Sequence, residues 1–144
     1  MTVAPATETT LASDLLTVVA RINRLANQRV RLPLPFAQAR LLSTIEAEGR
    51  ARISDLAALD HCSQPTMTTQ VRRLEEAGLV SRTVDPDDAR AVLISITPQG
   101  IATLAQVRAD RGNAIDPFME ELDSTDRDTL AAAVEIMRGL LAAH

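Results

Sequence analysis

Apolar residues near both ends of the chain recur at alternating spacings of four and three, the period of an α-helix with one buried face. Ser124 is expected to cap the C-terminal helix. Another helix should begin near Pro98, with Gly112 and Asp116–Pro117 weakening or kinking it. The apolar positions of the two terminal helices are Leu11, Leu15, Val18, Ile22 and Leu25, and then Leu130, Val134, Met137 and Leu141.

Three shorter helices are predicted in the middle of the chain. The prolines of Leu32–Pro35 separate them from the N-terminal helix, because proline has no amide donor. Ser54 and Ser63 are expected N-caps, since a serine hydroxyl accepts a hydrogen bond from an amide of the first helical turn. Gly49 and Gly78 are expected stops. The predicted elements are helices over 36–48, 55–59 and 64–77 and a very short strand over 51–53.

A β-hairpin is predicted after these helices. Branched residues dominate 80–84 and 91–96, and Asp85–Asp88 between them is typical of a turn. Two short helices, a hairpin and a long helix follow one another in a winged helix-turn-helix. In that fold the second helix, here called the reading helix, enters a DNA major groove, and the hairpin, or wing, reaches the minor groove. The expected fold class is therefore mainly α with a small hairpin wing.

The length of 144 residues suits one compact domain with a core. Residues 1–10 are small and polar and are expected to form a flexible arm. The winged part should span 36–97, flanked by dimerisation helices over 11–31 and 98–144. A small winged domain cannot cover the apolar faces of those helices, so we expect a two-fold homodimer. Its two reading helices would lie about 34 Å apart and match a palindromic site in double-stranded DNA.

The distribution of charge allows a DNA-binding face on an acidic protein. All 15 basic residues are arginines, which form bidentate hydrogen bonds to phosphates and guanine edges. Residues 98–144 hold 4 arginines and 8 acids and so account for the net charge of −4. No acid lies between His61 and Arg73. We therefore expect specific DNA binding that is sensitive to salt.

The polar positions around the predicted 64–77 helix are the candidate DNA contacts. Threonine is a mediocre helix former, so several threonines on one exposed helix face have little structural merit. Arg72 and Arg73 have a second interpretation, because the helix dipole favours cations near the C-terminal end. The candidates are Ser63, Gln64, Thr66, Thr68, Thr69, Gln70, Arg72 and Arg73.

Nearly the whole chain resembles the MarR family, the multiple-antibiotic-resistance regulators of bacteria. The segments that carry the resemblance are ISDLA, SQPTMTTQVRRLEEAGLVSR, DPDDAR and LISITPQG, in this order and spacing. The resemblance implies a homodimeric winged helix-turn-helix repressor whose dimer is built from the N- and C-terminal helices. It also implies a ligand cleft near the junction between those helices and the DNA-binding part.

The resemblance also assigns roles to residues of the reading helix, 64–73, and of the wing, 85–90. Arg90 corresponds to the arginine that enters the minor groove, where the negative potential attracts a guanidinium. Asp88 corresponds to the acid that orients it. The departure is Asp87 beside Asp88, which with Asp85 gives the wing three acids and one arginine. An attractive wing therefore requires that the acids point away from phosphate.

Three alternatives to a ligand-relieved DNA-binding repressor are considered in turn. A redox-responsive regulator acting through Cys62 is one alternative, although a small apolar packing group is the favoured interpretation of this residue. A winged domain used for protein contact is another. Catalytic motifs are missing and only 2 histidines are present, so the chain is not expected to be an enzyme. His61 and Cys62 are too few for a metal site, and no cofactor is expected.

The expected effector is a small phenolic or anionic ligand. Arg21 and Arg24 are weak candidates for its partners, because an arginine on an exposed helix face is the commoner case. No apolar run approaches the roughly 18 residues of a membrane helix, and the N-terminus lacks the pattern of a signal peptide. The expected location is the cytoplasm, with no membrane partner.

Overall fold

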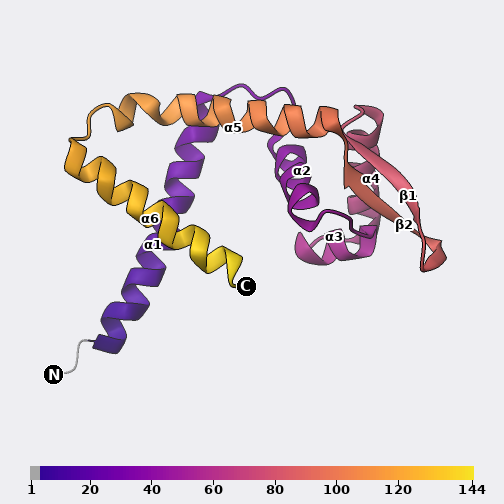
Figure 1. The fold of residues 1–144 in the computed structure, drawn as a ribbon, viewed down its shortest axis with the longest axis horizontal. Helices are drawn as coiled ribbons and strands as arrows, with labels where there is room; N and C mark the ends of the chain where they lie inside the picture. The colour runs from indigo at the N-terminus through magenta and orange to yellow at the C-terminus, as the bar shows by residue number, and fades with distance from the viewer. Residues whose placement is uncertain (1–3) are drawn as a thin grey trace. The chain divides into compact units, whose positions relative to one another are not determined.

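The computed structural model describes residues 4–144, with side chains from residue 10 onward. Over that part of the chain the fold is mainly helical with one antiparallel hairpin, as predicted (Figure 1). The elements are α1 (Ala4–Arg29), α2 (Phe36–Glu48), α3 (Ile53–Leu59), α4 (Gln64–Glu76), β1 (Val80–Asp85), β2 (Asp88–Ile96), α5 (Pro98–Met119) and α6 (Ser124–Ala142).

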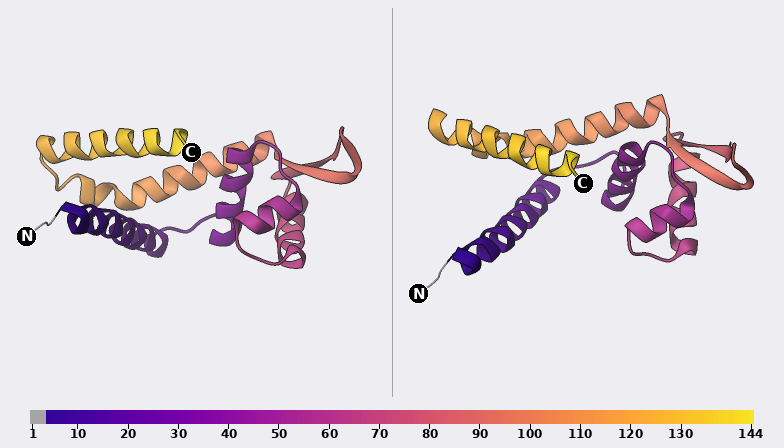
Figure 2. Two further views of the ribbon diagram at one scale, coloured as in Figure 1. Left: turned by 90° about the horizontal axis from the view of Figure 1, so that it is seen from below. Right: turned by 60° about the horizontal axis from the view of Figure 1, so that its bottom comes forward.

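The chain separates into two compact units, where the sequence led us to expect one. The winged unit is Val30–Asp110, and the helical unit is made of the residues up to Arg29 together with Arg111–His144. Helix α5 belongs to both, because its residues up to Asp110 lie in the winged unit and the rest lie in the helical unit. In both views of Figure 2 the hairpin extends away from α2, α3 and α4, as a wing does.

The winged unit is built around an aliphatic core to which all its elements contribute. Helix α4 buries Met67, Val71 and Leu74, the side that the spacing predicted. A fully buried side chain of this size contributes about 1.5–3 kcal/mol to folding. The other core residues are Leu41, Leu42, Ile45, Ala51, Leu56, Ala57, Leu79, Val80, Ile94 and Leu104. This core fixes which face of α4 remains exposed.

Both ends of α4 are closed by hydrogen bonds. The Ser63 hydroxyl accepts from the Thr66 amide at 3.2 Å, which confirms the expected N-cap. At the other end Gly78 has a φ of +77°. This conformation lets the Gly78 and Leu79 amides donate to the Glu75 and Leu74 carbonyls at 2.9 Å each. The reading helix is thus held at both ends by short-range contacts.

The start of α5 is fastened to the end of α4. The Thr97 hydroxyl donates to the Gly78 carbonyl at 2.7 Å and accepts from the Gly100 amide at 3.0 Å. The Thr97 amide donates to the Leu79 carbonyl at 3.0 Å. Gly100 is buried, and a Cβ at this position would lie 2.7 Å from Ile96 Cγ1 and closer still to the Leu79 carbonyl oxygen. Only glycine fits this close approach of two backbones.

Two N-cap predictions were wrong by one or two residues. Helix α3 begins at Ile53, with Arg52 at the N-cap and no side-chain cap, so Ser54 already lies inside the helix. The predicted strand over 51–53 is reduced to a single bridge between Ala51 and Ile94. Helix α6 is capped by Asp123, whose carboxylate accepts from the Asp126 amide at 2.8 Å. Aspartate is as good a cap as serine, and local sequence does not choose between neighbours.

Two further predictions about helix ends differ from the structure. Residues 1–10 were expected to be a loose arm, but α1 begins at Ala4, and the remainder of the predicted arm lies outside the described residues. Proline is tolerated in a first helical turn, so Pro5 does not prevent this start. Helix α5 continues through Gly112 and Pro117 to Met119, where a weakening or kink was expected. Pro117 lies in its last turn, close to the end.

The helical unit buries very little within one chain. Helix α6 has no buried residue, and Ala26 is the one buried residue among 10–29 of α1. Its polar contacts include the Arg29 guanidinium carbon 4.9 Å from the centroid of the Phe118 ring. In addition, Arg111 donates to Asn23 Oδ1 at 2.7 Å. The apolar faces of α1 and α6 therefore remain exposed.

Candidate nucleic-acid interface

The exposed side of α4 carries the polar residues that the sequence analysis selected. Gln64, Thr66, Thr69, Arg72 and Arg73 are all exposed, opposite the buried Met67, Val71 and Leu74. Thr68 and Gln70 flank this surface and are half-buried. Five of the candidates are therefore exposed around the solvent side of α4, and two are half-buried.

Hydrogen bonds within α4 fix what the threonines present to a partner. The Thr68 hydroxyl donates to the Gln64 carbonyl at 2.9 Å, and the Thr69 hydroxyl donates to the Pro65 carbonyl at 3.2 Å. Their hydroxyl protons are therefore used within the helix. What remains for a partner is a methyl group and the lone pairs of each hydroxyl oxygen. Such groups can contact the methyl group of thymine and accept hydrogen bonds from the amino groups of adenine or cytosine.

Two candidates, Ser63 and Gln70, differ from the others in their hydrogen bonding. The Ser63 hydroxyl donates to Thr66 Oγ1 at 2.8 Å while it accepts from the Thr66 amide, so its main role is to start the helix. Gln70 Oε1 is buried and has no hydrogen-bond partner among the described residues. A buried acceptor without a partner is unfavourable. Gln70 is thus the one candidate whose surroundings leave a polar atom unsatisfied.

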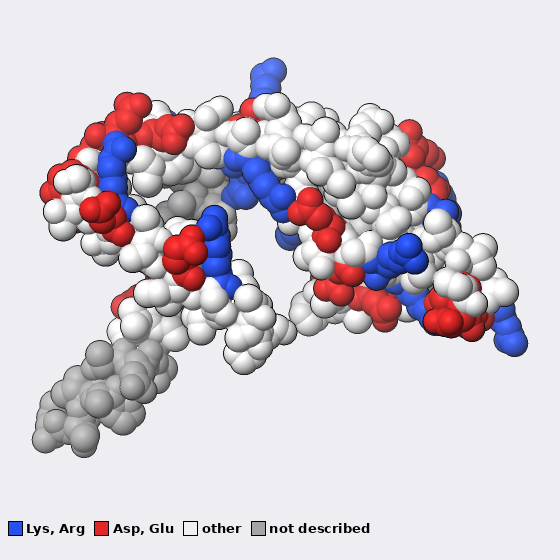
Figure 3. Space-filling view, in the orientation of Figure 1, with Lys and Arg blue, Asp and Glu red and all other residues white. Residues whose placement is uncertain are grey.

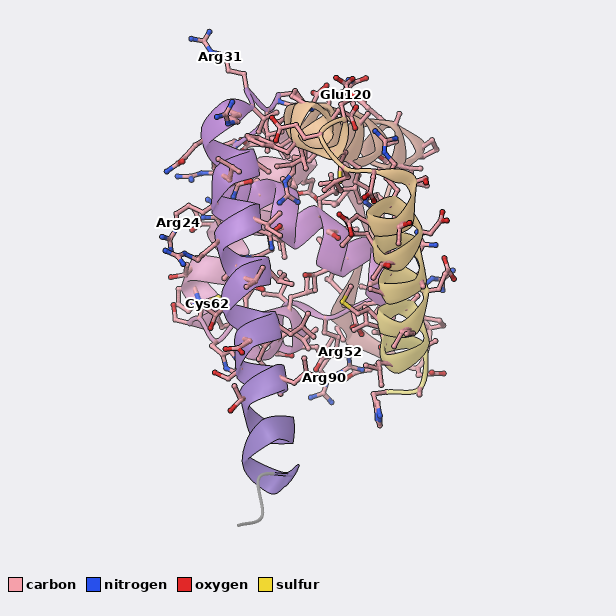
Figure 4. The ribbon with its side chains drawn as sticks, turned by 90° about the vertical axis from the view of Figure 1, so that its left-hand side faces the viewer. Arg24, Arg31, Arg52, Cys62, Arg90 and Glu120 are labelled. Carbon is pink, nitrogen blue, oxygen red and sulfur yellow. The ribbon has the colours of Figure 1, made fainter. Side chains whose placement is uncertain are left out.

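The wing departs from a regular hairpin near its tip. Val84 pairs with Val92, whereas the next residue, Asp85, pairs with Asp88 across the Pro86–Asp87 turn. Residues 89–91 are therefore extra in β2 and bulge from the ladder. Arg90 is the middle residue of this bulge and is exposed (Figure 4). Its guanidinium has no hydrogen bond or ion pair with any described residue, and so it is available to an external anion.

Two of the three wing acids are used to shape the turn. Asp88 accepts from the main-chain amide of Arg90 at 3.0 Å, so it holds the backbone of Arg90, not its guanidinium. Asp85 is buried and accepts from the Asp87 amide at 2.9 Å and from Arg52 Nη2 at 2.8 Å. Only Asp87 is exposed without such a bond. One of the three negative charges of the turn is therefore balanced by Arg52, while Asp87 and Asp88 keep theirs.

Arg52 was not predicted from the sequence as a functional residue. This residue precedes α3 and reaches the wing turn, 33 residues further along the chain. The Asp87 amide and then the Arg52 guanidinium bind the ionised carboxylate of Asp85 and lower its pKa below the usual 3.8, although burial opposes this change. No local signal marks the pair, because it depends on the folding of the hairpin beside residues 51 and 52.

The lowered pKa of Asp85 predicts how the stability of the winged unit changes with pH. A carboxyl group whose pKa is depressed by folding stabilises the fold above its usual pKa, and this contribution is lost as pH falls through the folded value. We expect Asp85→Asn to be less stable than the wild type near neutral pH, with the difference closing below about pH 4. Urea unfolding of both proteins from neutral to acid pH measures it. A difference that is constant over this range would contradict the prediction.

The remaining candidates occupy less distinctive environments. Arg21 and Arg24 are exposed on α1 and have no hydrogen bond or ion pair with a described residue; Figure 4 shows Arg24 extending from that helix. Cys62 is half-buried and packs against the core of the winged unit, which suits the interpretation as a packing group. No cluster of metal-ligating side chains exists among the described residues. None of the described helices is both long and apolar enough to cross a membrane.

Most acidic residues of the C-terminal part belong to the helical unit. In Figure 3 red side chains are concentrated where α5 ends and α6 begins, within the helical unit. They belong to a segment that includes Asp116, Glu120, Glu121, Asp123, Asp126 and Asp128. Most of the net negative charge of the chain thus belongs to the helical unit, and not to the unit that contains the reading helix.

Comparisons with known proteins agree with this geometry. The model of the MarR family matches residues 34–92. Over 132 residues the chain is 30% identical to an HTH-type transcriptional regulator of Mycobacterium tuberculosis, covering 91% of this chain and 92% of that protein. A transcriptional regulator from Thermotoga maritima is 25% identical, with a TM-score of 0.68 and 96% of each chain covered. The fold also matches that of a mutant MarR from E. coli complexed with operator DNA, at 23% identity, a TM-score of 0.60, and coverage of 89% and 93%.

Proposed function

The chain belongs to the MarR family of DNA-binding transcriptional regulators, and on this basis we propose that it represses transcription as a homodimer on a palindromic operator. A small phenolic or anionic effector relieves the repression. The observation that carries the proposal is the exposed face of α4, where two arginines, three other polar residues and no acid between residues 61 and 73 are held on a helix closed at both ends.

The wing supplies the second contact with DNA in this proposal. Arg90 is exposed on a bulge and has no internal partner, and a guanidinium is favoured in the negative potential of a narrow minor groove. Ser63, Gln64, Thr66, Thr68, Thr69, Gln70, Arg72 and Arg73 are the proposed residues at the major groove, with Asp88 supporting Arg90 through its main chain. Ser63 and Asp88 act by shaping the backbone.

The exposed apolar residues of the helical unit support a homodimer. A helix that buries nothing in its own chain gains no packing energy there, and most helices in proteins depend on such packing. On the apolar side of α6, Leu130 is 44% exposed and Leu141 81% exposed. Apolar area left in water forgoes about 25 cal/mol of stabilisation per Å². A second copy with the same faces would cover them, and two-fold pairing would present two reading helices to a palindrome.

Relief by a ligand follows from linkage. A small molecule that binds the dimer better in a form that does not fit the operator lowers DNA affinity, and DNA lowers the affinity for that molecule by the same factor. Arg21 and Arg24 are proposed partners of an anionic effector because neither has an internal ion pair. Regulation by a ligand can be tested separately from DNA binding.

Footprinting on the DNA upstream of the protein's own gene tests this function. We expect protection of one inverted repeat, weakened about 10- to 100-fold by Arg90→Ala, the usual contribution of a specific arginine contact. The matched control is Arg31→Ala, which removes the same charge from the opposite end of the winged unit and should change the affinity less than about two-fold (Figure 4).

Three results would contradict parts of the proposal. A protein that protects no fragment of that DNA would favour the alternative of a winged domain used for protein contact. Equal affinity for the inverted repeat and for random duplexes would contradict operator recognition. Protection that persists in the presence of hydroxylated aromatic acids at millimolar concentration would contradict relief by this class of effector.

A further inference from the structure

The wing is tied to the segment before α3 at two points. Ala51 and Ile94 exchange main-chain hydrogen bonds of 3.1 and 2.8 Å, which join this segment to β2 near the base of the hairpin. The next residue, Arg52, extends toward the tip and binds Asp85 at 2.8 Å. Figure 4 labels Arg52 and Arg90, which come from these two neighbouring elements. The hairpin is therefore held at its tip as well as at its base.

Asp85 connects Arg52 to the backbone of the turn. Its side chain is 10% exposed, against 43% for Arg52. One carboxylate oxygen accepts from Arg52 and the other from the Asp87 amide, so Arg52 is connected through a single side chain to the backbone of the turn. The register shift that makes residues 89–91 bulge begins at the same residue. The place where Arg90 leaves the sheet thus depends on the position of Asp85.

We propose that the Arg52–Asp85 pair is a positioning device that fixes the wing tip so that Arg90 enters the minor groove. The inference rests on the proposed function and adds to it two residues that do not themselves contact DNA. A hairpin tip with a three-residue bulge has few ladder hydrogen bonds of its own, and side-chain ties are then what limits its motion. The loss of either partner leaves the Arg90 backbone bond to Asp88 intact but releases the turn that carries it.

This role predicts opposite effects for two equal changes in charge. Removing any acid near DNA reduces the repulsion of phosphate and on electrostatic grounds alone should raise affinity. Asp87→Asn removes an exposed carboxylate that has no hydrogen bond or ion pair with a described residue, and we expect DNA affinity to rise about two-fold. Asp85→Asn removes the same charge two residues away but weakens the bond to Arg52, and we expect affinity to fall about five- to ten-fold.

The experiment measures the affinity of the purified dimer for a labelled duplex from the protected upstream region, at two salt concentrations, for both variants. Thermal melts establish that each variant is folded. Hydrogen exchange of the Asp87–Arg90 amides in the free protein gives a readout without DNA, and should become faster in Asp85→Asn but not in Asp87→Asn. A rise in affinity in both variants, or unchanged exchange in Asp85→Asn, would overturn the inference.

A double-variant cycle excludes direct contact between Arg52 and phosphate. Arg52→Gln should lower the affinity of the wild type about ten-fold but have little further effect in Arg90→Ala, because a positioning residue acts only through the residue that it positions. Arg52→Lys should recover part of the loss. Losses that multiply in the double variant would overturn the inference. If the wild type binds no DNA, the proposed function fails. If the wild type binds DNA and the two substitutions lower the binding free energy independently of each other, this inference alone fails.

Discussion

Replacement of Gly100 by alanine lowers the free energy of unfolding by about 3 kcal/mol or more, since an added methyl group in a filled site usually costs about 1–3 kcal/mol and here it meets backbone. The new Cβ would overlap the Leu79 carbonyl oxygen and lie 2.7 Å from Ile96 Cγ1. Backbone cannot rotate away as a side chain can. The α4–α5 connection would have to move, and we expect Tm to fall by roughly 10 °C.

Gly112 provides the matched control in the same helix. A Cβ built there meets no atom within 4 Å. Alanine is the better helix former by about 0.5–1 kcal/mol, so Gly112→Ala should leave Tm unchanged or raise it. Calorimetry of the two variants under the same conditions provides the comparison. A Gly100→Ala protein as stable as the wild type would show that the first turn of α5 does not approach Leu79 this closely.

Val134→Asp makes the protein monomeric at micromolar concentration and weakens operator binding by at least about 100-fold. Val134 lies in the middle of the α6 stripe and is 41% exposed in one chain. In the proposed dimer its carboxylate replacement would be buried without a partner, at a cost of several kcal/mol. The loss of the dimer lowers DNA affinity, because a monomer binds only one half-site. In a dimer, binding of one winged unit raises the effective concentration of the other at the second half-site.

Ala132→Asp is the control for this variant. It adds the same charge to the same helix, but two residues correspond to about 200° around the helix axis, so it lies on the opposite side from Val134. Sedimentation analysis should find this variant dimeric. A Val134→Asp protein that remains dimeric would place the interface elsewhere, and monomers of both variants would indicate that charge, not packing, decides assembly.

The elements of the winged unit could be predicted because their signals are local. The spacing of Met67, Val71 and Leu74 identified the buried face of α4, and Ser63 and Gly78 marked its ends correctly. The same local signals misplaced two caps, because Ser54 and Ser124 stand next to Arg52, Ile53 and Asp123, and the choice between neighbours is made by the packing of the helices. Hydrophobic spacing therefore predicts the buried face of a helix more reliably than it predicts the first and last residues of the helix.

The shape of the wing could not be predicted from its sequence. Asp85, Asp87 and Asp88 are identical in formal charge, and their different roles arise from contacts made after folding: one with Arg52, one with the Arg90 amide and one with solvent. The bulge of residues 89–91 likewise depends on register. The sequence therefore identified Arg90, but not the arginine that holds its turn.

The continuity of α5 has a mechanical consequence. Within the winged unit its Pro98–Asp110 part is a stiff rod about 20 Å long, so a twist of this part reaches Pro98 with little loss. There the rod is bonded through Thr97 to the last carbonyl groups around Gly78. Torsion of this rod would turn the end of the reading helix with it.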